Sequence, residues 1–394
     1  MNFSSNSNTA LFFSSIDEIS NEIWTQLECE NNLYFHRDFL KSIEINHSEI
    51  NFYYIILVDN SNKPIALASI QIVDFYLDTV KTNFEDFIRK IKNLLRKLYI
   101  LPNKKALKLL ISGNTFVSGD HGIFITHSQD KKQVIKNLAK AILHFVNSNN
   151  SINIDAFLLK DFVNESLFIT DELKNYNYHP FSVEPNMILE INEDWISFED
   201  YLNAIKTKFR VKAKKAIQLS KDIIIKEVND HNIENKLPKM TALYKKVVSN
   251  ADFNLSHFNL ESYKTLKSAF GEKYILKTYE LDGEIVGFMS GMINQNSLDA
   301  HFVGLDYSLN RQYAIYQRML YDYIQIAIAK KLKTLNFGRT ASEIKSSVGA
   351  KPQDLTMYLR HKKGITNKIV KLFLQYIQPS PFRQHFPFKN IKNE

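Results

Sequence analysis

The clearest alternation of hydrophobic and polar positions lies between residues 279 and 358. Two apolar runs meet at Asp282-Gly283, a dipeptide typical of the tight turn of a β-hairpin. A third run, 298–305, alternates with a period of two, and 313–331 repeats apolar residues at helical spacing. A short apolar run follows at 334–337. The order of three strands, a helix and a further strand predicts a mixed sheet with a helix on its face.

The third predicted strand carries a candidate proton acceptor. Simple alternation places Ala300 and Phe302 on one face of the strand, and Asp299 and His301 on the other. A histidine has an ordinary pKa near neutrality, so His301 is a candidate base for removing a proton from an amine. The alternative is a histidine that only completes the packing of the sheet.

The fourth strand ends in Gly338-Arg339-Thr340, and Lys345 and Gly349 follow within a few residues. Ligands of α/β sheets bind outside the carboxyl ends of strands. Arg339 and Lys345 are therefore predicted to meet a phosphate or an oxyanion there. Ordinary surface cations are the alternative.

The same order of elements occurs earlier in the chain. Strand, turn, strand, strand, helix and strand recur between residues 52 and 159, where a helix at 131–146 precedes the last strand. A further helix is expected at 84–99. We infer two tandem copies of one α/β (α+β, mixed-sheet) domain. The predicted division is an N-terminal domain at 1–192, a basic connecting helix at 193–222, a C-terminal domain at 223–362 that is presumed active, and a basic tail at 363–394.

Two segments concentrate positive charge. Residues 198–217 have a helical pattern crowded with lysine and arginine, among them Lys208 and Arg210, which suggests a surface that binds an anion. The tail has a basic amphipathic helix at 365–377, followed by three phenylalanines. A solvated face is the alternative for the first segment. For the tail, the alternatives are a docked helix and a contact with a membrane surface.

Composition narrows the class of protein. The net charge of +8 over 394 residues favours an anionic partner such as phosphate, acyl-coenzyme A, RNA or a lipid surface. One cysteine excludes an internal disulfide framework and fits a reducing, cytoplasmic setting. No apolar run is long enough for a membrane span, and no histidine spacing indicates a metal site. A cytoplasmic protein, peripheral on the inner membrane face in one alternative, is expected.

These segments resemble the GNAT acyltransferase superfamily, specifically its tandem-domain branch of Fem-type peptidoglycan aminoacyltransferases and envelope acetyltransferase-like proteins. The matching pieces are EIVGFMSGMI, LDAHFVGLD, KTKFRVKAKKAIQ and, above all, LNFGRTASEIKSSVGAKP. Gly338, Lys345 and Gly349 stand where that branch often has a glycine, a lysine and a second glycine. The resemblance spans about residues 24–362 and implies two tandem GNAT-like domains.

The chain departs from the superfamily before the long helix. Ordinary GNAT enzymes carry a glycine-rich turn there, whose backbone N–H groups hold the coenzyme A pyrophosphate. Residues 310–315 read NRQYAI, without glycine, and Arg311 in this stretch is one of the candidate donor-binding residues, with Gly338, Arg339, Thr340, Gly349, Lys208 and Arg210. The donors that remain open are acyl-CoA bound in another way, an acyl carrier protein and an aminoacyl-tRNA.

The resemblance implies transfer of an acyl group to an amine, with no permanently bound cofactor. A long-chain amine or aminolipid of the bacterial envelope is the expected acceptor. His301 is the candidate base, Lys345 and Arg339 neutralise the carbonyl oxygen or a donor phosphate, and Tyr316 or Tyr358 protonates the leaving group. The alternatives are aminoacyl-tRNA-dependent transfer to a peptidoglycan precursor, which is the less favoured, and a non-catalytic module that binds a lipid or glycan.

Overall fold

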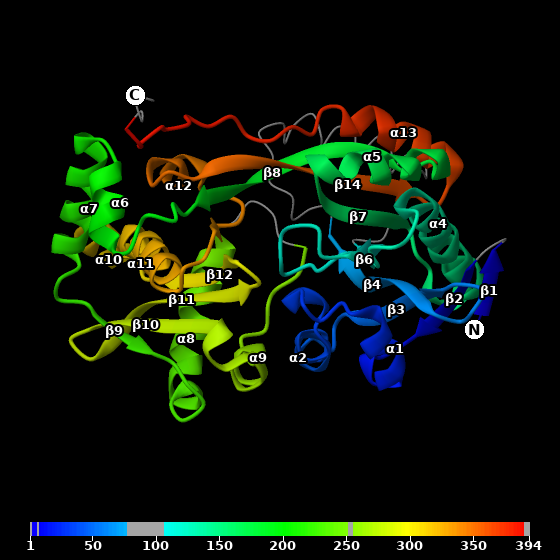
Figure 1. Cartoon of the computed structure of the whole chain (residues 1–394), viewed down its shortest axis with the longest axis horizontal. Helices are drawn as coiled ribbons and strands as arrows, with labels where there is room; N and C mark the ends of the chain where they lie inside the picture. Colours follow the sequence, from blue (N-terminus) through cyan, green and yellow to red (C-terminus); the bar gives the residue numbers. More distant parts are fainter. Residues whose placement is uncertain (1, 6–7, 77–105, 251–254, 390–394) are drawn as a thin grey trace. The chain divides into compact units, whose positions relative to one another are not determined.

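The computed structural model describes residues 2–5, 8–76, 106–250 and 255–389. These residues form two compact units (Figure 1). Unit 1 comprises residues 1–183, 251–258 and 354–379, and unit 2 comprises residues 184–250, 259–353 and 380–394. No helix of the described residues is long and apolar enough to span a membrane.

Unit 1 is built on a mainly antiparallel sheet. Its strands are β1 (Asn2–Ser5), β2 (Asn8–Phe13), β3 (Asn51–Val58), β4 (Pro64–Phe75), β5 (Leu107–Ser112), β6 (Ile123–Ile125), β7 (Ala156–Val163) and most of β14 (Lys351–His361). Strands β1 to β5 pair antiparallel in sequence order, and β6 pairs with β4. β7 pairs parallel with β5 and antiparallel with β14.

Helices cover this sheet. They are α1 (Asn21–Leu27), α2 (Arg37–Asn46), α4 (Lys131–Ser148), α5 (Leu167–Thr170) and α13 (Gly364–Leu374). Asp130 caps α4 by accepting the backbone N–H groups of Lys132 and Gln133. Apolar residues of α4, including Leu138 and Ile142, are buried against strand residues in the core of the unit.

Unit 2 repeats the arrangement. Its strands are β9 (Ile224–Glu227), β10 (Tyr274–Leu281), β11 (Glu284–Asn294), β12 (Ser297–Leu305), β13 (Thr334–Asn336) and most of β8 (His179–Glu190). Strands β9 to β12 pair antiparallel in sequence order. β13 pairs parallel with β12 and antiparallel with β8. Asp282 and Gly283 close the β10–β11 hairpin with positive φ angles of 50° and 83°, as the sequence predicts.

Helices pack on both faces of the unit 2 sheet. They are α6 (Phe198–Ala204), α7 (Thr207–Leu219), α8 (Ile233–Ser249), α9 (Ser262–Phe270), α10 (Tyr307–Tyr313), α11 (Ile315–Ala329) and α12 (Ser342–Ser347). A Cβ on Gly287 of β11 would lie 2.8 Å from the Met319 side chain of α11, so glycine permits the close approach of this helix. A Cβ on Gly304 of β12 would instead meet Phe288 and the backbone of α8.

The predicted mixed α/β architecture of two tandem domains is therefore confirmed, whereas several details differ. The units divide the chain at 183 and assign residues 354–379 to unit 1, unlike the predicted boundaries at 192 and 362. The helix expected at 84–99 lies outside the described residues. The helix expected at 198–217 is interrupted between α6 and α7, because the backbone at 204–206 instead hydrogen-bonds with Pro387 and Lys389, and Ile205 bridges to Phe388.

Candidate active site

β12 carries a β-bulge at the predicted base. Met289 of β11 pairs with Val303 and Gly291 pairs with Ala300, so His301 and Phe302 together stand opposite the single residue Ser290. The Ser290 hydroxyl donates to the Phe302 carbonyl oxygen at 2.8 Å. Bulges of this kind bend a strand and re-aim its side chains, and they are common beside functional sites.

The bulge overturns one sequence expectation. Phe302 packs against Tyr244 of α8, with ring centroids 5.2 Å apart, whereas Ala300 packs against the core cluster that contains α11. These two residues were expected on one face and lie on opposite faces. The rings of His301 and Phe302 are 4.2 Å apart, which consecutive strand residues achieve only when both point the same way. His301 therefore lies on the α8 face.

The neighbouring strand β13 is short. It pairs with β12 only along Ser297–Asp299, and β12 continues to Leu305 beyond the end of that ladder. A Cβ on Gly338, just after β13, would lie 4.0 Å from the Ala300 carbonyl oxygen. The residues after β13 thus stand beside the bulged part of β12, at the carboxyl end of β13.

A strained turn links β13 to α12. Gly338, Thr340 and Ala341 have φ angles of 70°, 65° and 49°. Positive φ is rare for residues other than glycine and costs most for a β-branched side chain such as threonine. Strain of this kind is concentrated at functional sites. The turn that the sequence singles out is therefore held in an uncommon backbone conformation.

Lys345 holds this turn from inside. Its ammonium group donates to the carbonyl oxygens of Gly338 at 3.2 Å and Arg339 at 2.5 Å. Burial lowers the pKa of Lys345 to about 7. Burial also lowers the pKa of the half-buried Arg339 to about 10, which leaves that guanidinium charged at neutral pH. Arg339 thus supplies positive charge at the strand end, and Lys345 positions the backbone that carries it.

The residue before α11 has the left-handed backbone conformation that glycine usually adopts, although it is an alanine. Ala314 is left-handed, at φ 50° and ψ 38°. The side chain of Asn310 accepts the backbone N–H of Tyr316 at 2.9 Å. One N–H group that a helix N-terminus would offer to a phosphate is therefore already bound within the chain. Arg311 is exposed beside this turn, on α10.

A cavity of about 490 Å³ begins where the strained turn ends. Ala341 and Ser342 line it, together with residues of α7, α11, α12 and the C-terminal segment. Its polar lining includes Lys212, Glu343 and His385. This cavity lies wholly within unit 2 and is large enough for part of a donor or acceptor.

The family model for FemAB-like proteins, described as peptidoglycan biosynthesis/recognition, matches residues 111–384. The chain belongs to the FemAB-like family. The match spans most of the chain, including the bulged strand and the turn at residues 338–341. No curated protein matches this FemAB-like chain.

Solved structures resemble the FemAB-like chain in fold, at low sequence identity. FemX superposes with a TM-score of 0.51 at 10% identity, covering 85% of this chain and 93% of that one. A tandem GNAT protein from the clavulanic acid biosynthesis pathway gives a TM-score of 0.53 at 7% identity, covering 90% and 98%. L-PGS from Bacillus licheniformis gives 0.50 at 10% identity, covering 91% and 97%. The tandem GNAT-like fold inferred from the sequence is confirmed.

The other candidate residues of this FemAB-like chain are dispersed. Tyr316 packs with the α11-side core, on the face opposite His301, and burial raises the pKa of its hydroxyl. Tyr358 is buried in unit 1, where its hydroxyl donates to Asp171 at 2.8 Å. The structure does not bring these two tyrosines to the bulge.

Three further candidates lie in the shell of unit 2. Gly349 has φ 107°, and a Cβ there would lie 2.4 Å from the Phe388 ring, so close packing accounts for this glycine. Lys208 is exposed on α7, with its ammonium 4.8 Å from the Phe209 ring centroid. Arg210 is half-buried on the same helix. These two cations stay a candidate anion-binding surface.

Sequence reasoning missed Ser290. Its hydroxyl stabilises the bulge, its carbonyl accepts the Tyr323 hydroxyl at 2.5 Å, and Tyr263 lies within 3.0 Å of its Oγ. A serine inside the apolar run GFMSGMI was the available signal, because a buried hydroxyl needs a partner.

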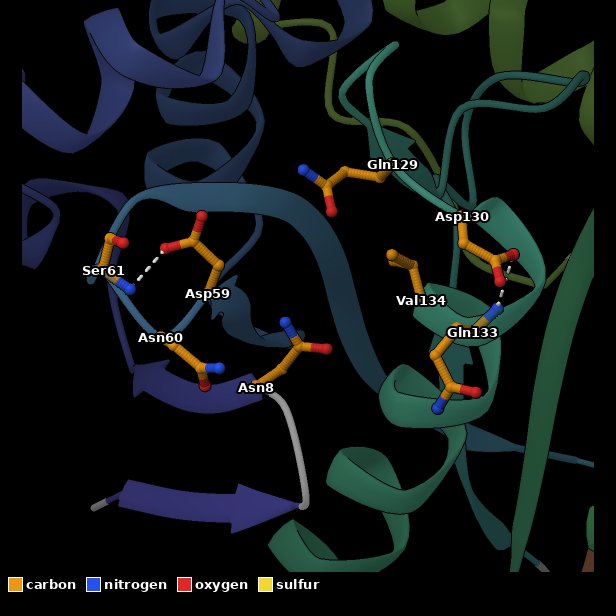
Figure 2. Close-up of a pocket in the computed structure, with 8 residues that line it drawn as sticks. All are labelled: Asn8, Asp59, Asn60, Ser61, Gln129, Asp130, Gln133 and Val134. Atoms are coloured by element: carbon orange, nitrogen blue, oxygen red, sulfur yellow. Dashed lines mark hydrogen bonds between the residues drawn. The ribbon is translucent and has the colours of Figure 1, made fainter.

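A second cavity, of about 320 Å³, lies in unit 1 (Figure 2). Figure 2 shows Asp59 bonded to the Ser61 backbone and Asp130 bonded to the start of α4. These carboxylates serve a turn and a helix cap, and the described residues that line the cavity include no Lys, Arg or His. Among the described residues no group of histidine, cysteine and carboxylate side chains could hold a metal ion. Of the catalytic candidates, His301, Lys345 and Tyr316 lie in unit 2, and Tyr358 lies in unit 1.

Proposed function

We propose that this FemAB-like chain is a transferase that forms an amide on an amine of a cell-envelope substrate, at the edge of β12 in unit 2. The observation that carries the proposal is the bulge at His301, which lies beside the strained turn after the short strand β13. The residues at that edge support this chemistry, and family membership supports the envelope substrate.

The proposed step is direct attack by the amine on the acyl carbonyl carbon. A carbon–nitrogen bond forms, and the bond between that carbon and the oxygen or sulfur of the donor breaks. His301 takes the proton that the amine loses and passes it to the leaving oxygen or sulfur. Arg339 is charged and half-buried at the strand end, where it stabilises negative charge on the donor or the carbonyl oxygen.

The first candidate for the donor is a thioester of coenzyme A or of an acyl carrier protein. An aminoacyl-tRNA is the second candidate, and the start of α11 favours it. There the Asn310 side chain already occupies the Tyr316 N–H, so the usual cradle for a coenzyme A pyrophosphate is incomplete. The exposed cations on α7 would meet an RNA backbone equally well.

The test presents the purified protein with acetyl-CoA, palmitoyl-CoA or alanyl-tRNA. The acceptors are phosphatidylethanolamine vesicles and a peptidoglycan precursor with a free lysine amine, and mass spectrometry detects the amide. We expect one donor–acceptor pair to turn over. His301→Asn should then lower kcat by roughly 100-fold or more with little change in KM. His231→Asn, on an exposed histidine of the same unit, is the matched control.

Each alternative has its own result. Turnover only with alanyl-tRNA, inhibited steeply by salt, identifies the tRNA-dependent reaction. Binding of an acceptor without turnover of any donor identifies a non-catalytic module. Full turnover by the His301→Asn protein removes the base from the proposal and leaves the reaction class standing. In cells, loss of an N-acylated envelope lipid when the gene is deleted would name the acceptor.

A further inference from the structure

Helix α13 has one buried side and one exposed side. Thr366, Asn367 and Leu374 are buried in unit 1, and the Asn367 side chain donates to the Asn177 carbonyl oxygen at 2.8 Å and accepts the His361 backbone N–H at 2.8 Å. These contacts fix which face of the helix points inward. The opposite face is therefore held outward by hydrogen bonds as well as by packing.

That outward face is apolar. Ile365, Leu372 and Tyr376 are 76%, 59% and 73% exposed. Their spacing of seven and four residues places them on one side of a helix and of its continuation. Ile377, just beyond the helix, is 45% exposed. We call Ile365, Leu372, Tyr376 and Ile377 the outer stripe. A contiguous exposed apolar stripe on one helix marks an interaction surface.

Positive charge accompanies the outer stripe. Lys368 and Lys371 are exposed on the same helix, and Lys362 and Lys363 are exposed directly before it. No aspartate or glutamate occurs between Asp354 and Glu394. The surface therefore combines exposed apolar side chains with lysines and carries no acidic residue of its own segment.

We propose that α13 binds an anionic lipid surface, with the outer stripe in the boundary between headgroups and acyl chains. The lysines would lie at the level of the headgroups. Apolar residues on one face with flanking lysines are the pattern of helices that lie in a membrane interface. The charge favours lipid over a second copy of this chain, because two such surfaces repel each other. This inference does not depend on the proposed reaction.

The tail that follows α13 offers less exposed apolar surface for a lipid contact than its sequence suggests. Phe382 and Phe388 pack against the core of unit 2, and Phe388 lies 5.7 Å from Trp195 between ring centroids. Phe386 is 65% exposed. The phenylalanine-rich end is therefore mostly docked within its unit, and the lipid contact belongs to the helix.

The experiment is co-sedimentation of the full-length protein with vesicles. Vesicles of equal parts phosphatidylglycerol and phosphatidylcholine are compared with pure phosphatidylcholine, at 150 and 500 mM salt. Ile365→Ser/Leu372→Ser should weaken binding to the anionic vesicles by about ten-fold or more. Lys368→Gln/Lys371→Gln should weaken it by roughly five-fold per lysine at the lower salt. Ile196→Ser is the control, because Ile196 is an 88% exposed apolar residue of unit 2.

Circular dichroism and the thermal transition should be unchanged in all variants, because every replaced side chain is exposed. Equal binding by the wild type and the Ile365→Ser/Leu372→Ser protein would overturn the inference, as would no binding of the wild type to anionic vesicles. Dimers in sedimentation velocity that only the Ile365→Ser/Leu372→Ser change dissolves, without vesicle binding, would assign the outer stripe to self-association instead.

Discussion

Replacing Lys345 by methionine is expected to remove a large part of the pH dependence of unit 2 stability. Burial lowers the pKa of this lysine in the folded chain to about 7, against an ordinary value of roughly 10.4 in the unfolded chain. Between those values the unfolded state binds the additional proton. The free energy of unfolding of the wild type therefore rises with pH across this window. Methionine keeps the length and the apolar stem and cannot titrate.

The size of the effect follows from the two pKa values. Below pH 7 the lysine is protonated in both states, and the slope vanishes. From pH 6 to pH 9 the wild type should gain about 2.5 kcal/mol in the free energy of unfolding relative to Lys345→Met. Loss of the donor to the Gly338 and Arg339 carbonyl oxygens should cost the variant about 1–3 kcal/mol, and that cost does not vary with pH.

The measurement uses the distribution of tryptophan. The chain has two tryptophans, Trp24 in unit 1 and Trp195 in unit 2. In a Trp24→Phe background, the fluorescence of Trp195 during urea unfolding reports on unit 2. Unfolding is measured at pH 6, 7, 8 and 9 for the background protein, for Lys345→Met and for Lys221→Met. Lys221 is an exposed lysine of the same unit and serves as the matched control.

If the free energy of unfolding changed with pH in the same way in the Trp24→Phe background protein and in its Lys345→Met variant, this reasoning would be refuted. It would mean that the two carbonyl acceptors keep the buried ammonium charged at neutral pH. Lys345 would then be a permanent cation beneath the turn at residues 338–341. A slope that only Lys345→Met abolishes would support a lysine that exchanges its proton near neutrality beside the proposed site.

Two further predictions concern unit 1. Lys160→Met removes the ion-pair partner of the fully buried Asp161 carboxylate and should lower the free energy of unfolding of unit 1 by about 3–5 kcal/mol. The double variant Lys160→Met/Asp161→Asn should recover most of that loss. Chemical unfolding measures both variants, and an equal loss of stability in the two would argue against a stabilising role for the pair. A chain ending at Gln353 lacks the β14 residues that pair with β7, so the free energy of unfolding of unit 1 should fall by about 5 kcal/mol or more. A chain ending at Lys389 keeps these residues and should show no such fall. The emission of Trp24 reports the result, and an unchanged unit 1 transition would contradict it.

Periodicity predicted the elements that bury one face. The helices at 131–148 and 315–329 and the hairpin at 274–294 lie close to their expected bounds, because each depends on local pattern and turn chemistry. Glycine and aspartate at 282–283 were sufficient for the hairpin. The same reasoning placed His301 on a strand and Gly338 at a strand end, which are the positions that the proposed site uses.

The β-bulge at His301 could not be predicted from periodicity. The alternation rule assumes that each residue of a strand faces a single residue of the neighbouring strand. At the bulge, His301 and Phe302 both face Ser290, and this pairing depends on contacts with residues outside the strand's own sequence. The hydrogen bond from Ser290 to the Phe302 carbonyl oxygen, together with the ring contact to Tyr244, fixes the register there. Likewise, the break before α7 depends on residues 387–389, which no window around Lys206 contains.

Strands β8 and β14 explain why the two units differ from the predicted domain boundaries. β8 follows β7 of unit 1 directly in sequence, yet residues 188–190 of β8 pair with β13 of unit 2. β14 follows β13 of unit 2, yet residues 355–361 pair with β7 of unit 1. A boundary drawn between repeats assigns each of these strands to the copy it follows in sequence, whereas residues 184–190 belong to unit 2 and residues 354–361 to unit 1. Tyr358 illustrates the consequence, because a candidate from the active copy becomes a core residue of unit 1 whose hydroxyl binds Asp171. The fold of unit 1 therefore depends on residues 354–379, which follow most of unit 2 in the sequence, and neither unit is specified by one continuous half of the chain.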